Sequence, residues 1–282
     1  MKLFEITRKR QLNENMVWIS IYAPLVAKHA RPGQFVILRT DEYGERVPLT
    51  MAGHDEEAGT VDIIFAAVGR SSAMMFNMEE GDCFADVVGP LGKPTHMEGL
   101  KRVCIVGGGT GNALAYPLAT GMKKAGIEVD MISGFKSKDY VILEDEFRAG
   151  VDRLFVVTDD GSYGRKGVVT LPLQEALEAG EGYDEVITIG PLIMMKFVVA
   201  TTKPFGVKTT VSMNPIMIDG TGMCGGCRLT VGGKVKFACV DGPDFDGFQV
   251  DFDEAMSRGA SYRDFEKHAY DEACNLFKKE VE

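Results

Sequence analysis

Three of the six cysteines in this 282-residue chain fall within sixteen residues, in a segment rich in glycine. Cys224 and Cys227 are separated by two glycines, and Cys239 follows after eleven further residues. Deprotonated sulfur is a strong ligand for iron and zinc, and glycines let the backbone wrap closely around a metal site. Asp219 stands where the plant-type iron–sulfur pattern C-x4-C-x2-C…C has its first cysteine. The segment therefore predicts a metal centre with Asp219, Cys224, Cys227 and Cys239 as ligands.

Two other interpretations of the three cysteines stay open. Structural zinc sites usually have two CxxC-like pairs or combine cysteine with histidine, whereas Cys239 is a single third sulfur without a nearby histidine. A redox-active disulfide within the Cys224–Cys227 pair would leave Cys239 without a role. An iron–sulfur cluster, in its simplest form [2Fe–2S], uses all three sulfurs and is the interpretation that we favour. Asp219 either ligates iron or only begins a turn.

Composition excludes several classes of protein. The net charge of −10 argues against a nucleic-acid partner. No run of eighteen apolar residues is present, so we expect no membrane span. The first sixteen residues are too charged for a signal peptide, and free thiols beside a metal motif suit a reducing compartment. We expect a cytoplasmic protein, in which the remaining Cys83, Cys104 and Cys274 are buried structural residues.

The elements that precede the cysteines divide into two patterns. Residues 1–98 contain short alternating runs separated by Pro-Gly, Tyr-Gly and Ala-Gly turns, which are typical of a small antiparallel barrel. Within this part, the segment 46–50 (RVPLT) combines a guanidinium with a hydroxyl, and the segment 66–73 (AAVGRSSA) ends in small and hydroxyl residues. The second segment predicts a helix start whose free N–H groups could hold a pyrophosphate. Each signal is weak alone.

Residues 99–212 alternate strand and helix. A continuous apolar strand at 102–106 leads into a glycine loop at 107–111, a helix at 112–125 and a strand at 128–133. This βαβ pattern is typical of a nucleotide-binding fold with a parallel sheet, although Asn112 replaces the third glycine of G-x-G-x-x-G. Further strands at 153–158 and 185–190 end in loops placed for nicotinamide contact. The acidic ribose marker is unclear because Asp130 falls within a strand, so the choice between NADH and NADPH stays open.

These segments together resemble the ferredoxin–NADP reductase superfamily, and in particular its iron–sulfur flavoprotein electron-transfer subunits. The resemblance covers roughly the whole chain and has two branches. Electron-transfer subunits of bacterial dihydroorotate dehydrogenases normally have four cysteines in the loop. Small subunits of electron-bifurcating NADH-dependent reduced ferredoxin:NADP+ oxidoreductases have an aspartate in the first position, as Asp219 is here, and this departure favours the second branch.

The resemblance assigns roles to matched positions. Arg46, Pro48, Leu49 and Thr50 look like the R-x-P-L-T flavin motif, with Arg46 and Thr50 as the catalytic candidates and Thr50 near the reactive edge of the flavin. The second flavin segment, which holds the FAD pyrophosphate, corresponds to Val68, Gly69, Ser71 and Ser72. The nicotinamide-nucleotide elements correspond to Gly108, Gly109, Thr110, Gly111, Asp160, Gly190 and Pro191. Ile189 replaces the cysteine of the usual C-G-P, so no catalytic thiol is expected.

The resemblance implies a three-part chain and an electron-transfer function. We expect an FAD-binding barrel (1–98), an NAD(H)-binding α/β domain (99–212) and a [2Fe–2S] region with a closing helix (213–282). Such a subunit exchanges a hydride between NAD(H) and FAD and passes single electrons to a larger iron–sulfur flavoprotein subunit, which handles ferredoxin and NADP(H). The alternatives are a dihydroorotate dehydrogenase subunit and a non-catalytic redox sensor. Whether sulfide or polysulfide is also a substrate stays open.

Overall fold

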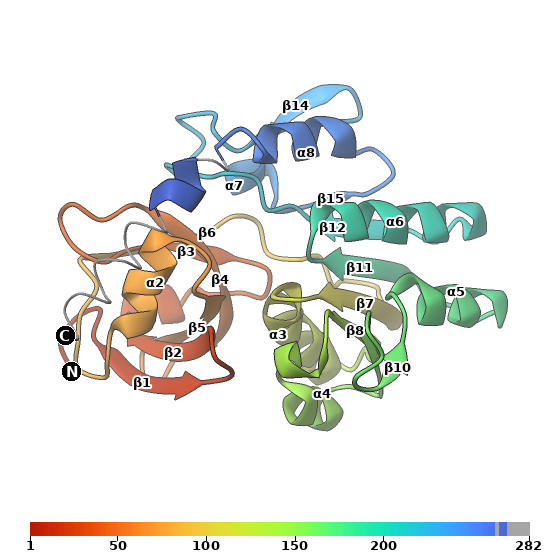
Figure 1. Ribbon diagram of the computed structural model, residues 1–282, viewed down its shortest axis with the longest axis horizontal. Helices are drawn as coiled ribbons and strands as arrows, with labels where there is room; N and C mark the ends of the chain where they lie inside the picture. Colours follow the sequence, from red (N-terminus) through yellow and green to blue (C-terminus); the bar gives the residue numbers. More distant parts are fainter. Residues whose placement is uncertain (263–264, 270–282) are drawn as a thin grey trace.

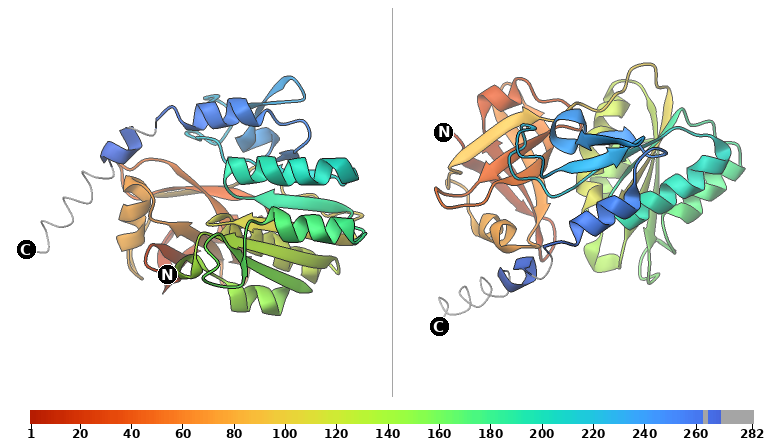
Figure 2. Two further views of the ribbon diagram at one scale, coloured as in Figure 1. Left: turned by 45° about the vertical axis from the view of Figure 1, so that its right-hand side comes forward. Right: turned by 90° about the horizontal axis from the view of Figure 1, so that it is seen from above.

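The computed structural model describes residues 1–262 and 265–269. Figure 1 shows a barrel beside a parallel sheet flanked by helices, with a smaller C-terminal region above both. Seen from above, that C-terminal region lies over the junction between the barrel and the sheet (Figure 2). None of the described helices combines the length and apolarity that a membrane span requires.

The N-terminal barrel is antiparallel, as the alternating sequence predicts. Its strands are β1 (Ile6–Gln11), β2 (Met16–Tyr22), β3 (Phe35–Arg39), β4 (Val47–Asp55), β5 (Thr60–Ala66) and β6 (Asp86–Leu91). They follow the order β1-β2-β5-β4-β3-β6, so that β4, which carries most of the RVPLT segment, lies between β3 and β5. Two short helices join the strands, α1 (Pro24–Ala27) and α2 (Arg70–Asn77). The barrel interior is filled by alternating apolar side chains of its strands, which is what period-two patterning requires.

The nucleotide sheet has the order β10-β9-β8-β7-β11-β12-β15, parallel except for its last strand. Its strands are β7 (Arg102–Gly108), β8 (Glu128–Phe135), β9 (Arg153–Thr158), β10 (Arg165–Lys166), β11 (Glu185–Ile189), β12 (Thr209–Ser212) and β15 (Asp244–Asp246). The helices are α3 (Gly111–Lys124), α4 (Glu144–Gly150), α5 (Thr170–Glu178) and α6 (Leu192–Thr202), with 3-10 turns η1 (Lys138–Tyr140) and η2 (Lys203–Phe205). Both faces of β7 are buried: Val103 and Ile105 pack with α3 and α4, whereas Cys104 and Val106 pack with α5 and α6. A fully covered sheet explains the unbroken apolar run of β7.

The C-terminal region leaves the sheet after β12 and returns to it as β15. Between them lie the cysteine loop, which we define as residues 218–227, and three short elements: β13 (Arg228–Val231), β14 (Lys234–Phe237) and α7 (Ala238–Asp241). The chain then forms α8 (Phe252–Gly259). One apolar core joins Phe35 and Ile37 of the barrel, Met195 of α6, and Cys227 and Cys239. The C-terminal region is thus held by both of the larger parts.

Several expectations can be compared with these elements. Cys104 is fully buried, as expected, but the prediction of a buried strand residue is wrong for Cys83, which is exposed and forms only an isolated bridge with Glu5. Cys274 lies outside the described residues, and so does much of the C-terminal segment in which the closing helix is expected. The division of the chain at residues 98 and 212 stays a prediction.

Candidate functional site

The cysteine loop brings the predicted metal ligands together as two pairs. Cys239, on α7, donates its backbone N–H to the Cys227 sulfur at 3.5 Å, and both side chains are 2% exposed. Cys224 is exposed, and its sulfur accepts the N–H of Gly226 at 3.4 Å. The backbone of Asp219 also contacts the Cys224 sulfur. One pair is therefore buried, and the other lies at the surface.

The two pairs differ in how readily sulfur becomes a thiolate, which is the form that binds metal. The backbone N–H of Gly226 lowers the pKa of the Cys224 thiol below its ordinary value. Burial, followed by the neighbouring Cys227, raises the pKa of Cys239 to about 12. A bound metal ion deprotonates such a coordinating thiol outright. The chemistry of the donors therefore fits a thiolate-ligated centre.

Asp219 contributes an ionised carboxylate at the start of the loop. Its Oδ2 accepts hydrogen bonds from the hydroxyl and backbone N–H of Thr221, and more weakly from the N–H of Met223 at 3.4 Å. These bonds, the Thr221 hydroxyl first, lower the pKa of the Asp219 carboxyl. The second oxygen, Oδ1, makes no hydrogen bond among the described residues, so the turn and a ligand role are compatible.

The pairing of the donors suits a two-iron cluster. Among residues 1–262 and 265–269, no three His, Cys, Asp or Glu side chains are gathered at one point. A [2Fe–2S] cluster instead divides its ligands between two iron atoms, which suits one pair at 219 and 224 and another at 227 and 239.

The cysteine loop is attached directly to the barrel strand expected to contact flavin. Arg46, just before β4, donates from Nη2 to the Asp219 carbonyl at 3.1 Å and from Nε to the Ile218 carbonyl at 3.3 Å. Gly220 has a φ of +82°, and a Cβ there would lie 2.4 Å from Cδ1 of Ile37 on β3. Only glycine gives this conformation and this close approach without strain. The predicted flavin and metal segments are therefore neighbours.

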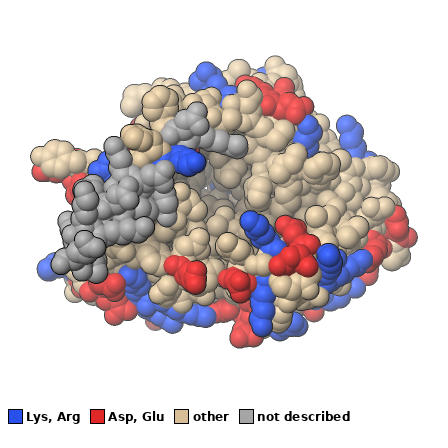
Figure 3. Space-filling model, in the orientation of Figure 1, with Lys and Arg blue, Asp and Glu red and all other residues tan. Residues whose placement is uncertain are grey.

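The two flavin segments also meet. Pro48, Leu49 and Thr50 lie half-buried along β4. Ser71 donates a hydrogen bond to the carboxylate of Glu45, just before the RVPLT segment. Figure 3 shows a hollow at the centre of this face of the molecule, between the barrel and the nucleotide sheet. The two predicted flavin segments are therefore in contact through Ser71 and Glu45.

Within the second segment, the residues divide between structure and exposure. Ser72 is largely buried, and its hydroxyl accepts the N–H groups of Val68 and Gly69 at 3.0 and 2.9 Å, just before α2. Val68 is 74% exposed. Ser72 therefore shapes the turn, and no hydrogen bond among the described residues uses the N–H groups of Arg70, Ser71 and Ser72.

The nucleotide segments converge at the carboxyl ends of two adjacent strands. Ile189 of β11 pairs with Gly107 of β7, which places Gly190-Pro191 beside the glycine loop. A Cβ on Gly111 would lie 2.2 Å from the Ile189 carbonyl oxygen, so the start of α3 approaches β11 as only glycine allows. Gly108 ends β7, and Gly109 and Thr110 form the turn that leads from β7 to α3, with a φ of +54° at Gly109. Ligands in open parallel sheets bind at this edge.

Asn112 is a site residue that the motif comparison undervalued. Its side-chain amide donates to the carbonyls of Gly109 and Gly134 at 3.0 and 3.1 Å, which fastens the glycine loop to the end of β8. It is fully buried. The departure from the third glycine was visible in the sequence, but the purpose of the amide requires knowing that β8 ends beside the loop. Asp160 follows β9 at the same edge, where its Oδ1 accepts the N–H and hydroxyl of Ser162.

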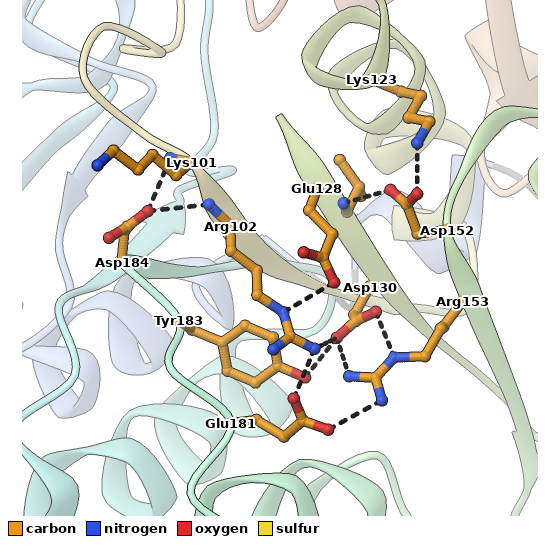
Figure 4. Close-up of polar contacts among 11 residues, drawn as sticks. Lys101, Arg102, Lys123, Glu128, Asp130, Asp152, Arg153, Glu181, Tyr183 and Asp184 are labelled. Carbon is orange, nitrogen blue, oxygen red and sulfur yellow. Dashed lines mark hydrogen bonds and ion pairs between the residues drawn. The ribbon is translucent and has the colours of Figure 1, made fainter. Parts of the chain in front are cut away.

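Asp130 is at the wrong end of the sheet for a ribose marker. Figure 4 shows its carboxylate between the guanidinium groups of Arg102 and Arg153, which begin β7 and β9. Tyr183 also donates to it, at 2.7 Å. Burial alone would raise the pKa of this carboxyl, but the hydrogen bonds from Arg153 and Tyr183 outweigh burial and lower it. Asp130 is therefore an ionised structural residue. Lys136 and Lys138 lie exposed just beyond the carboxyl end of β8, which is the edge where such sheets bind nucleotides.

A second feature beside the cysteine loop was not expected from sequence. A cavity of about 640 Å³ lies between the start of α6, the loop and α8, lined among others by Ile193, Ile218, Gly226 and Met256. Two arginines also line it and contact the loop: Arg228 donates to the Gly225 carbonyl at 3.2 Å and Arg258 to the Gly226 carbonyl at 3.3 Å.

A flavin-type barrel, a nucleotide sheet and a thiolate loop held between them define an iron–sulfur flavoprotein of the ferredoxin reductase class. Comparison with known proteins agrees. Residues 214–251, which contain all four predicted ligands, match the family described as the iron–sulfur cluster binding domain of dihydroorotate dehydrogenase B.

Whole-chain similarities are closer still. The chain is 46% identical to a dihydroorotate dehydrogenase B (NAD(+)) electron transfer subunit homolog of Thermotoga maritima, over 95% of both sequences. It is 33% identical to the dihydroorotate dehydrogenase B (NAD(+)) electron transfer subunit of Clostridium perfringens, over 86% of this chain and 98% of that one. A solved structure of the NADH-dependent reduced ferredoxin–NADP oxidoreductase, studied for flavin-based electron bifurcation, contains a chain that is 46% identical. The match covers 96% of this chain and 98% of that chain, with a TM-score of 0.90.

The chain belongs to the family of dihydroorotate dehydrogenase B electron-transfer subunits and their homologues. The predicted fold class, a β-barrel followed by a nucleotide-binding α/β sheet and an iron–sulfur region, is confirmed. The expectation of an oxidoreductase subunit that uses a flavin, NAD(H) and an iron–sulfur cluster beside a larger subunit is confirmed at the level of the family. The individual cofactor-binding residues stay predictions.

Proposed function

We propose that this chain is the small subunit of an electron-bifurcating NADH-dependent reduced ferredoxin:NADP+ oxidoreductase. The observation that carries the proposal is the whole-chain match to such a structure, at 46% identity and a TM-score of 0.90. The ligand set supports it, because Asp219 stands where the four-cysteine pattern has its first cysteine. Thiolate ligands also favour a reducing compartment, and we propose the cytoplasm.

Each part of the chain would hold one cofactor. FAD, when bound, accepts a hydride from NADH and can release the two electrons singly, and a [2Fe–2S] cluster takes one electron at a time. Arg46 to Thr50 and Val68 to Ser72 would hold FAD. The glycine loop at 108–111, Asp160 and Gly190-Pro191 would hold NAD(H). Asp219, Cys224, Cys227 and Cys239 would hold the cluster.

The position of the cysteine loop suits electron exchange in two directions. On one side, Arg46 and the contact of Gly220 with the barrel join the loop to the flavin strands. On the other, the tip of the loop is open: Cys224 is exposed, and Met223 is 83% exposed. Ile218 and Val240, which lie beside Gly226 and Gly222 of the loop, are also exposed, at 59% and 40%, and a group of exposed apolar residues marks a protein contact. We propose that the larger subunit docks on this side and provides the ferredoxin and NADP(H) sites.

The test is anaerobic co-purification followed by spectroscopy and assay. We expect a complex with a larger subunit that reduces ferredoxin with NADPH only when NAD+ is present. Asp219→Cys should change the electron paramagnetic resonance signal of the reduced cluster, because a fourth sulfur replaces a hard oxygen ligand. An unchanged signal would remove Asp219 from the ligand set, and a native protein purified as a lone monomer would count against the subunit assignment.

A second function is favoured by a specific observation. The match of residues 214–251 is to the cluster domain of dihydroorotate dehydrogenase B, and one-third identity extends over nearly the whole of such a subunit. In that case the co-purified partner would contain FMN and oxidise dihydroorotate. Detecting that activity, with no NADPH–ferredoxin exchange, would replace the first proposal by the second.

A further inference from the structure

Three arginines from different parts of the fold donate hydrogen bonds to backbone carbonyls of the cysteine loop. Arg46 reaches it from the barrel, Arg228 from the start of β13 and Arg258 from the end of α8. Every acceptor is a backbone carbonyl, and each belongs to a predicted ligand residue, precedes one or lies between two of them. These acceptors are the carbonyls of Ile218, Asp219, Gly225 and Gly226.

The Gly225 carbonyl belongs to the same peptide as an N–H group that donates to sulfur. In a planar trans peptide the C=O and the following N–H point in opposite directions. The Gly225 carbonyl points outward to Arg228 at 3.2 Å, and the N–H of the same peptide, on Gly226, points inward to the Cys224 sulfur at 3.4 Å. The backbone N–H of Arg228 donates to the same carbonyl at 3.4 Å, so the Arg228 side chain adds a second bond to a peptide whose N–H faces a predicted ligand.

The same residues bring positive charge to a site that is otherwise negative. Thiolates and the Asp219 carboxylate are anionic ligands, and adding an electron to a cluster increases the negative charge further. Guanidinium groups stay protonated at any physiological pH, so their charge favours the reduced state. Net charge and hydrogen bonds to sulfur are two of the factors that set cluster reduction potentials. The arginines supply the first directly and support the second.

We propose that Arg228, Arg258 and Arg46 are positioning residues that raise the reduction potential of the iron–sulfur site. All three place positive charge beside the loop, and Arg228 also helps to hold the Gly225–Gly226 peptide with its N–H toward the Cys224 sulfur. Arg258 is the principal member of the three, because it is half-buried and joins α8 to the loop. The inference rests on the cluster of the family and is independent of bifurcation.

The experiment is a potentiometric titration of the cluster signal in the full-length protein at low ionic strength, where exposed charges are least screened. Arg258→Gln should lower the midpoint by about 59 mV, which is a tenfold change in the ratio of reduced to oxidised cluster. Arg228→Gln should lower it by less, because Arg228 is exposed. Arg258→Lys keeps the charge and should stay nearer to the wild type than Arg258→Gln. Arg46 is left unchanged because it is also a flavin candidate.

The matched control is Arg8→Gln, an exposed arginine on β1, which β2 and β5 separate from β4 in the same sheet. It should leave the midpoint unchanged. Glutamine variants that keep their iron and their wild-type midpoint would overturn the proposal, and so would a lysine variant that shifts as far as the glutamine variant. If Arg258→Gln does not retain iron, Arg228→Gln decides by the same comparison. If the variants shift the midpoint as expected but the complex does not bifurcate electrons, the proposed function fails and this inference stands.

Discussion

Replacing Asp130 by asparagine should weaken the fold and leave nucleotide binding intact. The carboxylate is fully buried and accepts hydrogen bonds from Arg153 Nε at 2.7 Å, Arg102 Nη2 at 3.3 Å and Tyr183. Asparagine has nearly the same volume but turns an N–H donor toward a guanidinium donor. Breaking a buried ion pair costs about 3–5 kcal/mol. We expect the lower end, because both arginines keep Glu181 as a second partner.

A loss of about 3 kcal/mol should lower the Tm by roughly 6–12 °C. Differential scanning calorimetry measures this shift, and the KM for NADH in flavin reduction measures nucleotide binding. The control is Glu128→Gln, which removes a half-exposed partner of Arg102 at 3.2 Å and should cost less than about 1 kcal/mol. A wild-type Tm together with a raised KM for NADH in Asp130→Asn would refute the reasoning and make Asp130 a nucleotide-binding residue.

Three further outcomes follow from the geometry. The difference in unfolding free energy between wild type and Asp130→Asn should narrow as pH falls below about 4. The lowered pKa of Asp130 stabilises the fold above the unfolded-state pKa, and this contribution is lost when the carboxylate is protonated. A difference in Tm that stays constant with pH would contradict this prediction. Gly220→Ala should reduce the iron content per chain, because the new Cβ would lie 2.4 Å from a barrel side chain. Gly233 also has a positive φ but has open space around it, so Gly233→Ala should keep the wild-type iron content. Equal iron contents in the two variants would disprove this prediction. Gly111→Ala should raise the Kd of NADH at least tenfold, because the new Cβ would push α3 away from the Ile189 carbonyl of β11. Gly182 has no atom within 4 Å of the Cβ position, so Gly182→Ala should bind NADH as the wild type does. Calorimetric titration with NADH measures both Kd values, and a wild-type Kd in Gly111→Ala would contradict the prediction.

Local patterns were sufficient to predict most of the two larger parts of the fold. Strand β7 is an unbroken apolar run because helices cover both of its faces, and glycines follow it because α3 approaches β11 there. The spacing of Cys224, Cys227 and Cys239 likewise indicates a metal site, because each type of centre has its own set of ligands and spacings. Patterns of this kind depend on neighbours in the sequence, and a single chain displays them.

The features that sequence did not predict depend on contacts between distant residues. Arg258 meets the Gly226 carbonyl across thirty-two positions, and nothing in its own surroundings distinguishes it from a surface arginine. The role of Asp130 stayed open because it falls within a strand, and the alignment of β8 with its neighbours places it near the amino end of that strand. Cys83 was expected to be buried because of its residue type, but its segment forms only one bridge at the edge of the barrel.

The return of the chain at β15 has a consequence for how such proteins diversify. Ser212 ends β12 and Asp244 begins β15, and the two are paired directly. The whole redox insertion, residues 213–243, therefore starts and finishes at one point on the border of the sheet. The entropy cost of closing a loop grows only slowly with its length, so an excursion at this border can be lengthened, shortened or given different ligands without changing the register of the strands. The iron-binding part is in this sense an insertion between two paired positions of the nucleotide sheet.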